Sequence, residues 1–251
     1  MLETFETEIP QLIEGEERRI YVYTPDKRGK FPVLYMFDGQ NLFDDEEATY
    51  GKSWGLFDYL KENKVPLIVV GVECNHHGEE EKCGGRLSEY TPFPFEDPHW
   101  GKIKARGKIT MDFFVNELKP YIDDNYPTKP DRKHTFIAGS SMGGLMTLYA
   151  LCRYNDVFSR GASLSPSLTF APEKVLSMIR NGRMKSDTVL YMDYGEKEFY
   201  GRSRQAFADA TAALIRKKIR VTSRIAPNGE HNEASWEKAV PFFMDILFYE
   251  G

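Results

Sequence analysis

The chain has 251 residues, of which 41% are hydrophobic and 28% charged, and a formal net charge of −5 at pH 7. These values are ordinary for a globular protein, and the length suits one α/β domain with a full core. The acidic balance and the lack of a basic stripe argue against a nucleic-acid-binding protein, and weakly against action on anionic polymers or membrane surfaces.

The N-terminus and the cysteines bear on the compartment. Residues 1–19 carry early acidic side chains and no apolar core of a signal peptide, and no run approaches the length of a membrane span. The three cysteines, Cys74, Cys83 and Cys152, are few and odd in number, which fits a reducing compartment better than a disulfide framework. We therefore expect a cytoplasmic protein.

The first half of the chain alternates predicted strands and helices. Strands are expected at residues 19–24, 31–37 and 66–72, and a helix at residues 54–63. The run at 31–37 is almost continuously apolar, which is typical of a strand buried on both faces. This alternation predicts an α/β fold with a mostly parallel sheet and helices on both faces.

From about residue 73 to residue 108 the chain becomes polar, aromatic and rich in proline. We interpret this stretch as a long insertion within a single domain that covers residues 1–251. A loop of this length after the end of a strand is usually functional and should reach over the catalytic edge. Candidates for shaping a substrate pocket are Arg86, Tyr90, Phe93, Phe95 and Trp100.

The same stretch contains Cys74, His76, His77 and Cys83, which are residue types that can bind a metal. Their spacing matches no compact zinc pattern, and the residues between His77 and Cys83 are strongly charged. We expect no metal here and no cofactor elsewhere.

A helix is expected at residues 109–126, with Pro120 as a kink, and it leads into the most informative stretch of the chain. Residues 135–150 read TFIAGSSMGGLMTLYA, a short β-prone run, a Gly-rich turn and a helix. A serine inside Gly-x-Ser-x-Gly in this context is typical of the nucleophile elbow of α/β-hydrolases. Ser141 is therefore the candidate nucleophile, and the Met142 N–H at the helix start is a candidate oxyanion donor.

The second half continues the alternation of strands and helices. Strands are expected at residues 161–165, 188–194 and 219–225, and helices at 172–179, 203–218 and 233–249. The helix at 203–218 is predicted to be capped by Ser203. Its inward side chains are expected to be Phe207, Thr211, Leu214 and Ile215.

A serine nucleophile requires a general base, which is oriented in turn by a third group. In α/β-hydrolases the base and the acid follow the serine, and His231 is the only histidine after Ser141. For the acid, Glu198 has the length and position to reach the histidine, and Glu196 and Asp193 remain alternatives. The loop after the strand at 31–37 would supply a second oxyanion amide, for which Gln40 is the candidate, unless Asp38-Gly39 is a simple turn.

Several of these segments together resemble the putative esterase family, which is similar in fold to S-formylglutathione hydrolase. The matching segments are DGQNLFD, RLSEYTPF, GSSMGGLMTLY, the Gly-x-x-acid after YMDYGEKE, and GEHNEASW. The family includes feruloyl and acetyl-xylan esterases, siderophore esterases and mycolyltransferases. The resemblance implies Ser141, His231 and Glu198 as the triad, with the Gln40 and Met142 amides as oxyanion hole. Many relatives carry Asp at the position of Glu198.

These residues predict a serine esterase that works through an acyl-enzyme. The aromatic, proline-rich segment at 90–100 favours a small-molecule or oligosaccharide ester, with a short acyl, acetyl or feruloyl group. A siderophore esterase, a thioesterase or an acyltransferase could use the same site, and a noncatalytic carbohydrate-binding protein is the outside alternative. A homodimer is possible, since such dimers are common.

Overall fold

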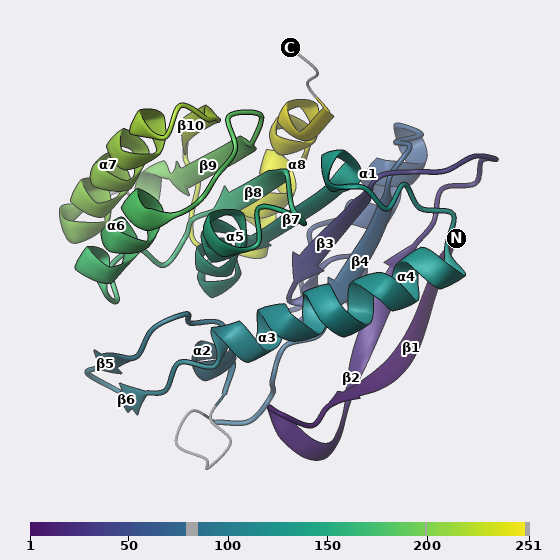
Figure 1. Cartoon of the computed structure of the whole chain (residues 1–251), viewed down its shortest axis with the longest axis horizontal. Coiled ribbons are helices and arrows are strands. Elements are labelled where there is room, and N and C mark those ends of the chain that lie inside the picture. Colours follow the sequence, from purple (N-terminus) through teal and green to yellow (C-terminus); the bar gives the residue numbers. More distant parts are fainter. Residues whose placement is uncertain (79–84, 199, 249–251) are drawn as a thin grey trace. The chain divides into compact units, whose positions relative to one another are not determined.

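The computed structural model describes residues 1–78, 85–198 and 200–248. The chain forms two compact units, residues 1–135 and residues 136–251, which are drawn in Figure 1. Each unit is described by itself. The expectation of a single domain with one insertion stays a prediction.

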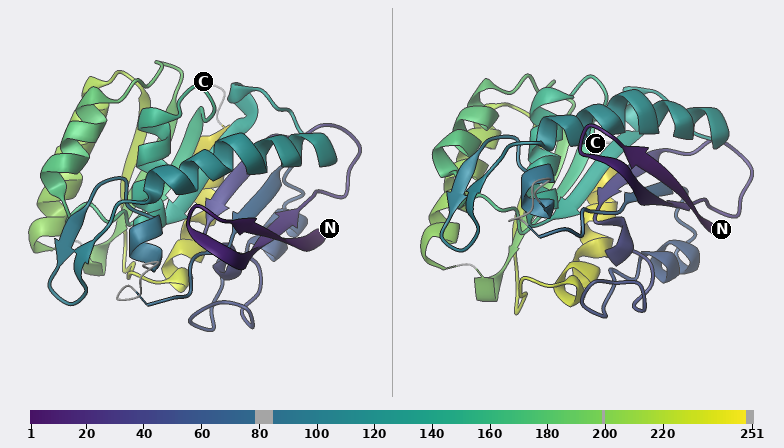
Figure 2. Two further views of the ribbon diagram at one scale, coloured as in Figure 1. Left: turned by 60° about the horizontal axis from the view of Figure 1, so that its bottom comes forward. Right: turned by 90° about the horizontal axis from the view of Figure 1, so that it is seen from below.

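In the described part of the first unit, the sheet has four strands. Their spatial order is β1 (Leu2–Ile9), β2 (Ile13–Tyr23), β4 (Ile68–Val72) and β3 (Val33–Phe37). β3 and β4 are parallel, whereas β2 is antiparallel to both β1 and β4. The strands predicted in this half are confirmed. β1 was not predicted, and it pairs with β2 along the whole length of that strand in a long hairpin, seen in both views of Figure 2.

Helices cover both faces of this sheet, as its register shows. Tyr23 of β2 pairs with Val69, and Tyr35 of β3 pairs with Val70, so the two tyrosines point to opposite faces. The Tyr23 ring lies 6.1 Å from Phe57 of α1 (Leu56–Glu62). The Tyr35 ring lies 6.4 Å from Phe114 in the long helical segment of residues 107–125.

That long segment is interrupted where the sequence predicted a kink. It comprises α3 (Gly107–Phe113), a π-helical turn (Phe114–Leu118) and α4 (Lys119–Asn125). Pro120 lies in the first turn of α4, directly after the π-helical turn. Proline has no backbone N–H to donate, which accounts for the local change in the hydrogen-bond pattern.

The segment predicted as an irregular loop has secondary structure of its own. It contains the short helix α2 (Arg86–Glu89) and the antiparallel hairpin of β5 (Phe95–Asp97) and β6 (Gly101–Ile103). A further 3-10 turn, Gly39–Asn41, follows β3. Cys83 lies outside the described residues.

Within the described residues of the second unit, the sheet has four strands, all parallel. In spatial order they are β7 (Thr135–Ser140), β8 (Arg160–Leu164), β9 (Val189–Gly195) and β10 (Arg220–Ala226). The helices are α5 (Met142–Arg153), α6 (Pro172–Asn181), α7 (Gly201–Arg216) and α8 (Glu233–Phe248). The strands and helices predicted in this half are confirmed, with ends shifted by one or two residues.

The helices of this unit also cover two faces (Figure 1). Tyr194 of β9 packs its ring on Phe207 of α7, with centroids 5.3 Å apart. Tyr191, three residues earlier and thus on the other face, packs on Phe243 of α8 at 6.3 Å. Parallel strands with helices on both faces confirm the predicted fold class.

Two local predictions were wrong. The N-cap of α7 is Tyr200, and Ser203 is instead the third helical residue, whose side chain completes a capping box. Ile215, expected to face inward, is 62% exposed, although Phe207 and Leu214 are buried.

Among the described residues, no helix is both long and apolar enough to cross a membrane.

Candidate active site

Ser141 lies at the sharp turn between β7 and α5. Its backbone angles are φ 56° and ψ −119°, a strained conformation for a residue with a side chain. The turn is tight because β7 and α5 touch through glycines: a Cβ on Gly139 would lie 2.8 Å from the carbonyl carbon of Gly143. The Ser141 N–H donates to Leu164 O over 2.9 Å, which ties the turn to the end of β8.

The Ser141 hydroxyl lies 3.3 Å from the hydroxyl of Ser167, in the loop after β8. The Ser167 N–H also donates to Ser141 O over 3.0 Å, so this loop is held against the elbow. Met142 is the first residue of the 12-residue helix α5. The first N–H groups of a helix lack partners within the helix, so this end can bind a developing negative charge.

Glu198 and His231 form a short hydrogen bond. His231 Nδ1 lies 2.6 Å from Glu198 Oε2, and the Glu198 side chain is only 12% exposed. The other carboxylate oxygen accepts from the Gly195 N–H over 2.7 Å and from the Ser165 hydroxyl. Burial alone would raise the pKa of Glu198, but the hydrogen bonds with His231, Ser165 and Gly195 outweigh it and lower the pKa. The carboxylate is therefore charged at neutral pH and can orient the imidazole.

Two glycines allow the loops that carry these residues to meet. A Cβ on Gly195 would lie 2.4 Å from Gly229 O, so only glycine fits. The Lys197 N–H donates to the same carbonyl over 2.9 Å. The Trp236 ring lies 5.2 Å from the His231 ring in a T-shaped arrangement.

The two alternative acids have other partners. Asp193 is buried on the face of β9 that also carries Tyr191, whose hydroxyl donates to the Asp193 carboxylate over 2.7 Å. Burial raises the pKa of Asp193 to about 6. Glu196 accepts from the Asn228 N–H over 2.9 Å. Within the described residues, neither contacts His231.

The three predicted triad residues thus all lie in the second unit. The described contacts join Glu198 to His231 and Ser141 to Ser167, and among described residues they include no hydrogen bond between Ser141 and His231. Hydrogen bonds between catalytic groups are often long without substrate. The catalytic roles of these residues stay predictions.

Gln40 lies in the first unit, in the 3-10 turn after β3. Its side chain accepts from the Cys74 N–H over 3.3 Å and donates to the Cys74 sulfur over 3.2 Å. The turn is pressed against β4, since a Cβ on Gly39 would lie 2.7 Å from the carbonyl carbon of Gly71. The loop is therefore rigidly held, and the oxyanion role of the Gln40 amide stays a prediction.

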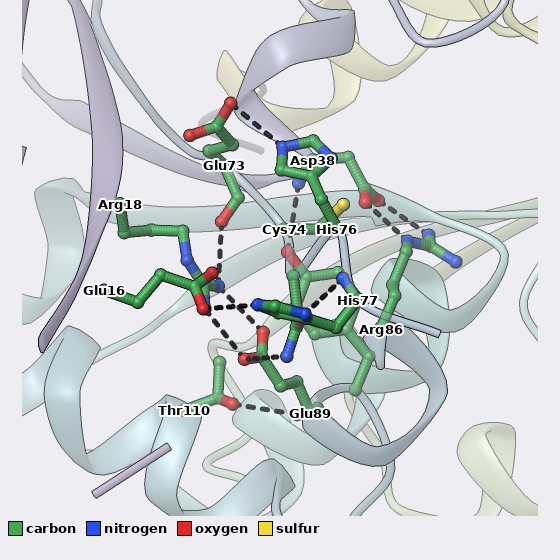
Figure 3. Close-up of polar contacts among 12 residues, drawn as sticks. Glu16, Arg18, Asp38, Glu73, Cys74, His76, His77, Arg86, Glu89 and Thr110 are labelled. Carbon is green, nitrogen blue, oxygen red and sulfur yellow. Dashed lines mark hydrogen bonds and ion pairs between the residues drawn. The ribbon is translucent and has the colours of Figure 1, made fainter. Parts of the chain in front are cut away.

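Arg86 uses its guanidinium within this unit (Figure 3). Its Nε and Nη2 atoms donate to the two carboxylate oxygens of Asp38 over 2.5 and 2.7 Å, and its side chain is 28% exposed. Tyr90 is buried beneath it, with its hydroxyl accepting from the Asp38 N–H. Trp100 is 42% exposed. Arg86 and Tyr90 thus hold Asp38 in place through hydrogen bonds to its carboxylate and its backbone N–H. Trp100, by contrast, is accessible to solvent.

The other charged groups and histidines labelled in Figure 3 form ion pairs. Arg18 and Glu89 are both buried and join through two hydrogen bonds of 2.9 Å. His76 pairs with Glu73 at 3.0 Å, and His77 pairs with Glu16 at 2.6 Å. In the described part of the chain, no three histidine, cysteine or acidic side chains gather as metal ligands. The expectation of no metal stays a prediction.

Sequence reasoning missed three residues around the candidate site, Ser165, Ser167 and Trp236. Ser165 donates to Glu198 and accepts from the Trp236 indole N–H over 3.2 Å. Their signals in the sequence are weak: Ser165 ends the strand predicted at residues 161–165, Ser167 lies two residues later, and Trp236 follows His231 by five positions.

Comparisons with known proteins identify related sequences and folds. The family described as Putative esterase matches residues 12–244. The uncharacterized protein YbbA of Bacillus subtilis is 25% identical over 197 residues, which cover 75% of this chain and 71% of YbbA. The endo-1,4-beta-xylanase/feruloyl esterase of Xylanibacter ruminicola is 24% identical over 228 residues, 88% of this chain but 27% of that protein.

The solved structures agree on the fold. The enterobactin and salmochelin hydrolase IroE superimposes with a TM-score of 0.70 at 18% identity, covering 99% of this chain and 95% of IroE. At that identity the likeness shows the fold alone, which is of the α/β-hydrolase type.

Proposed function

We propose that this chain, which belongs to the putative esterase family and is a carboxylic ester hydrolase, works through an acyl-enzyme formed on Ser141. His231 acts as the general base, and Glu198 orients it. The observation that carries the proposal is the 2.6 Å hydrogen bond from His231 Nδ1 to Glu198, in the same unit as a strained serine at a strand-to-helix turn.

The first step is attack on the ester. Glu198 holds the proton of the imidazole on Nδ1, which leaves Nε2 as the basic nitrogen. Nε2 removes the proton of the Ser141 hydroxyl as the oxygen attacks the ester carbonyl carbon. The tetrahedral intermediate collapses when the histidine returns this proton to the leaving alcohol. A water molecule, deprotonated by the same nitrogen, then releases the acid and restores Ser141.

The negative charge of each tetrahedral intermediate requires hydrogen-bond donors. The Met142 N–H, at the start of α5, is the first proposed donor, and the Gln40 N–H is the second, by its place in the family pattern. Removal of one such donor typically costs about 100- to 1,000-fold in kcat. No step of this mechanism needs a metal or a redox cofactor.

For the substrate we propose acetyl, short-acyl or feruloyl esters of carbohydrates. The name of the Xylanibacter relative and the exposed Trp100 in an aromatic segment support this class. The alternatives are a siderophore ester, supported by the name of the similarly folded IroE, and acyl transfer from thioesters or to alcohols. We place the enzyme in the cytoplasm, where it would meet imported oligosaccharides.

The test compares the purified protein with two single variants on p-nitrophenyl acetate, p-nitrophenyl butyrate and methyl ferulate. We expect turnover by the wild type and a loss of roughly 10⁴-fold or more in kcat for Ser141→Ala. Ser167→Ala is the matched control, because it removes the neighbouring hydroxyl, and it should keep kcat within about tenfold. An unchanged rate for Ser141→Ala would exclude the proposed nucleophile.

A further inference from the structure

A cavity of about 460 Å³ lies in the second unit, outside the candidate triad. One wall is the loop after β8, with Leu168 and Phe170, and a second is the start of α6, with Glu173 and Leu176. The third wall is one face of α7, formed by Arg202, Gln205, Ala206 and Asp209 at helical spacing. Cavities of this size commonly hold small molecules or parts of them.

Two of the segments that line the cavity are directly connected to residues of the candidate site. Leu168 directly follows Ser167, whose hydroxyl lies 3.3 Å from that of Ser141. On the other side, Ser203 of α7 donates to Glu198 O over 2.9 Å, which ties the start of the helix to the turn of the acid. The cavity therefore adjoins the serine and the acid through short, hydrogen-bonded connections.

The lining of the cavity is partly apolar and partly polar. The inner part is apolar, with Leu168 and Val175 buried and the Phe170 ring beside them. The rim carries carboxylates at Glu173 and Asp209, the guanidinium of Arg202 and the amide of Gln205. The Gln205 amide donates to Asp209 over 3.0 Å, which holds the carboxylate in place.

This chemistry selects among possible ligands. Two carboxylates against one guanidinium disfavour an anionic ligand, such as a metal-catecholate complex. A purely apolar acyl chain could pack on the apolar wall but would make no use of the polar rim, whose exposed groups would stay hydrated. A neutral sugar ring fits both parts, because its C–H face can pack on the apolar wall and its hydroxyls can bond to planar side chains that both donate and accept.

We propose that this cavity binds the sugar ring of the leaving alcohol, so that α6 and α7 determine the specificity of the enzyme for carbohydrate esters. The proposal rests on the proposed esterase function and adds the location and chemistry of an alcohol subsite. The acyl group is bound elsewhere, so esters that differ only in the alcohol should respond differently to changes in the cavity.

The experiment compares two esters with the same acyl group, methyl ferulate and feruloylated arabinose. Ala206→Trp fills the cavity from the α7 wall, and Ala208→Trp places the same side chain on an exposed position of α7 outside the cavity. We expect Ala206→Trp to lower kcat/KM for the sugar ester by about tenfold or more and to leave methyl ferulate within about twofold. Ala208→Trp should change neither.

Equal losses on both esters would overturn the proposal, since they would place the acyl group or the whole site in the cavity. Unchanged kinetics for both esters would also overturn it. Gln205→Ala serves as a second variant with little risk to folding, because Gln205 is exposed, and it should lower kcat/KM for the sugar ester selectively.

A wild type that hydrolyses neither ester would argue against the proposed function but would leave the cavity testable. Xylobiose is then titrated into ¹⁵N-labelled protein and into Ala206→Trp. Amide shifts at residues of α6 and α7 in the wild type alone would support the sugar site. The absence of shifts at these helices would overturn it.

Discussion

Replacement of Glu198 by glutamine tests how the acid controls the base. The substitution keeps the size of the side chain and removes its charge. The oxygen Oε1 accepts from the Gly195 N–H over 2.7 Å and from the Ser165 hydroxyl. Because a backbone N–H can only donate, the oxygen of the new amide should stay at this position.

The amide NH₂ group would then face His231 Nδ1, where Oε2 lies at 2.6 Å in the native chain. A donor at this position forces Nδ1 to accept, so the imidazole proton moves to Nε2. The nitrogen that should remove the serine proton is then no longer a base. A triad locked in the wrong tautomer loses about 10⁴-fold in kcat, or roughly 5.5 kcal/mol of barrier.

The assay is kcat for p-nitrophenyl acetate at pH 7.5 for the wild type, Glu198→Gln and the matched control Glu196→Gln. We expect the loss in Glu198→Gln alone, with KM nearly unchanged, because the acid does not touch the substrate. A Glu198→Gln variant that keeps more than a tenth of the wild-type kcat would refute the reasoning. So would an equal loss in Glu196→Gln.

Two further predictions concern stability, measured by urea unfolding. Arg18→Met leaves the buried Glu89 carboxylate without its ionic partner and should lower the free energy of unfolding by roughly 3–5 kcal/mol. The control Arg19→Met removes an exposed ion pair of 3.8 Å and should lower it by less than about 1 kcal/mol. Equal losses in the two variants would contradict this account. Asp193 has a pKa raised from 3.8 to about 6, so the folded state holds its proton more tightly than the unfolded state, and the contribution of this group to stability falls as pH rises through that window. Asp193→Asn removes this pH dependence, so the stability of the variant relative to the wild type should increase by roughly 2 kcal/mol between pH 4 and pH 7. A pH-independent difference would show that the group titrates normally.

The parts of the site that depend on local sequence could be predicted. Ser141 follows a short β-prone run and precedes a helical pattern, so strand, turn and helix were all visible within 16 residues. Glu198 lies three residues after Gly195, at the end of a predicted strand, and the structure places it against His231. The order of the chain alone identified the histidine, because it is the only one after the serine.

The parts that depend on pairing between distant segments could not be predicted. The ion pair between Arg86 and Asp38, 48 positions earlier in the chain, had no signal in the sequence, and the expected role of Arg86 in a substrate pocket stays a prediction. Ser165 contacts Glu198 from a backbone with φ 41°, which no residue pattern signals for a serine. Ile215 follows the helical period of α7 yet is exposed, whereas its neighbour Leu214 is buried, and the period alone does not separate two adjacent apolar residues.

The indole of Trp236 gives the enzyme an internal optical probe. Its N–H bonds to Ser165, which bonds to Glu198, and its ring lies 5.2 Å from His231. A protonated imidazole quenches the emission of a neighbouring indole, so the fluorescence lost on Trp236→Phe substitution should report the charge of the base during turnover. The Trp100 ring lies 4.3 Å from the His99 ring, so the signal of Trp236 has to be taken as the difference between the native chain and Trp236→Phe and not from the total emission.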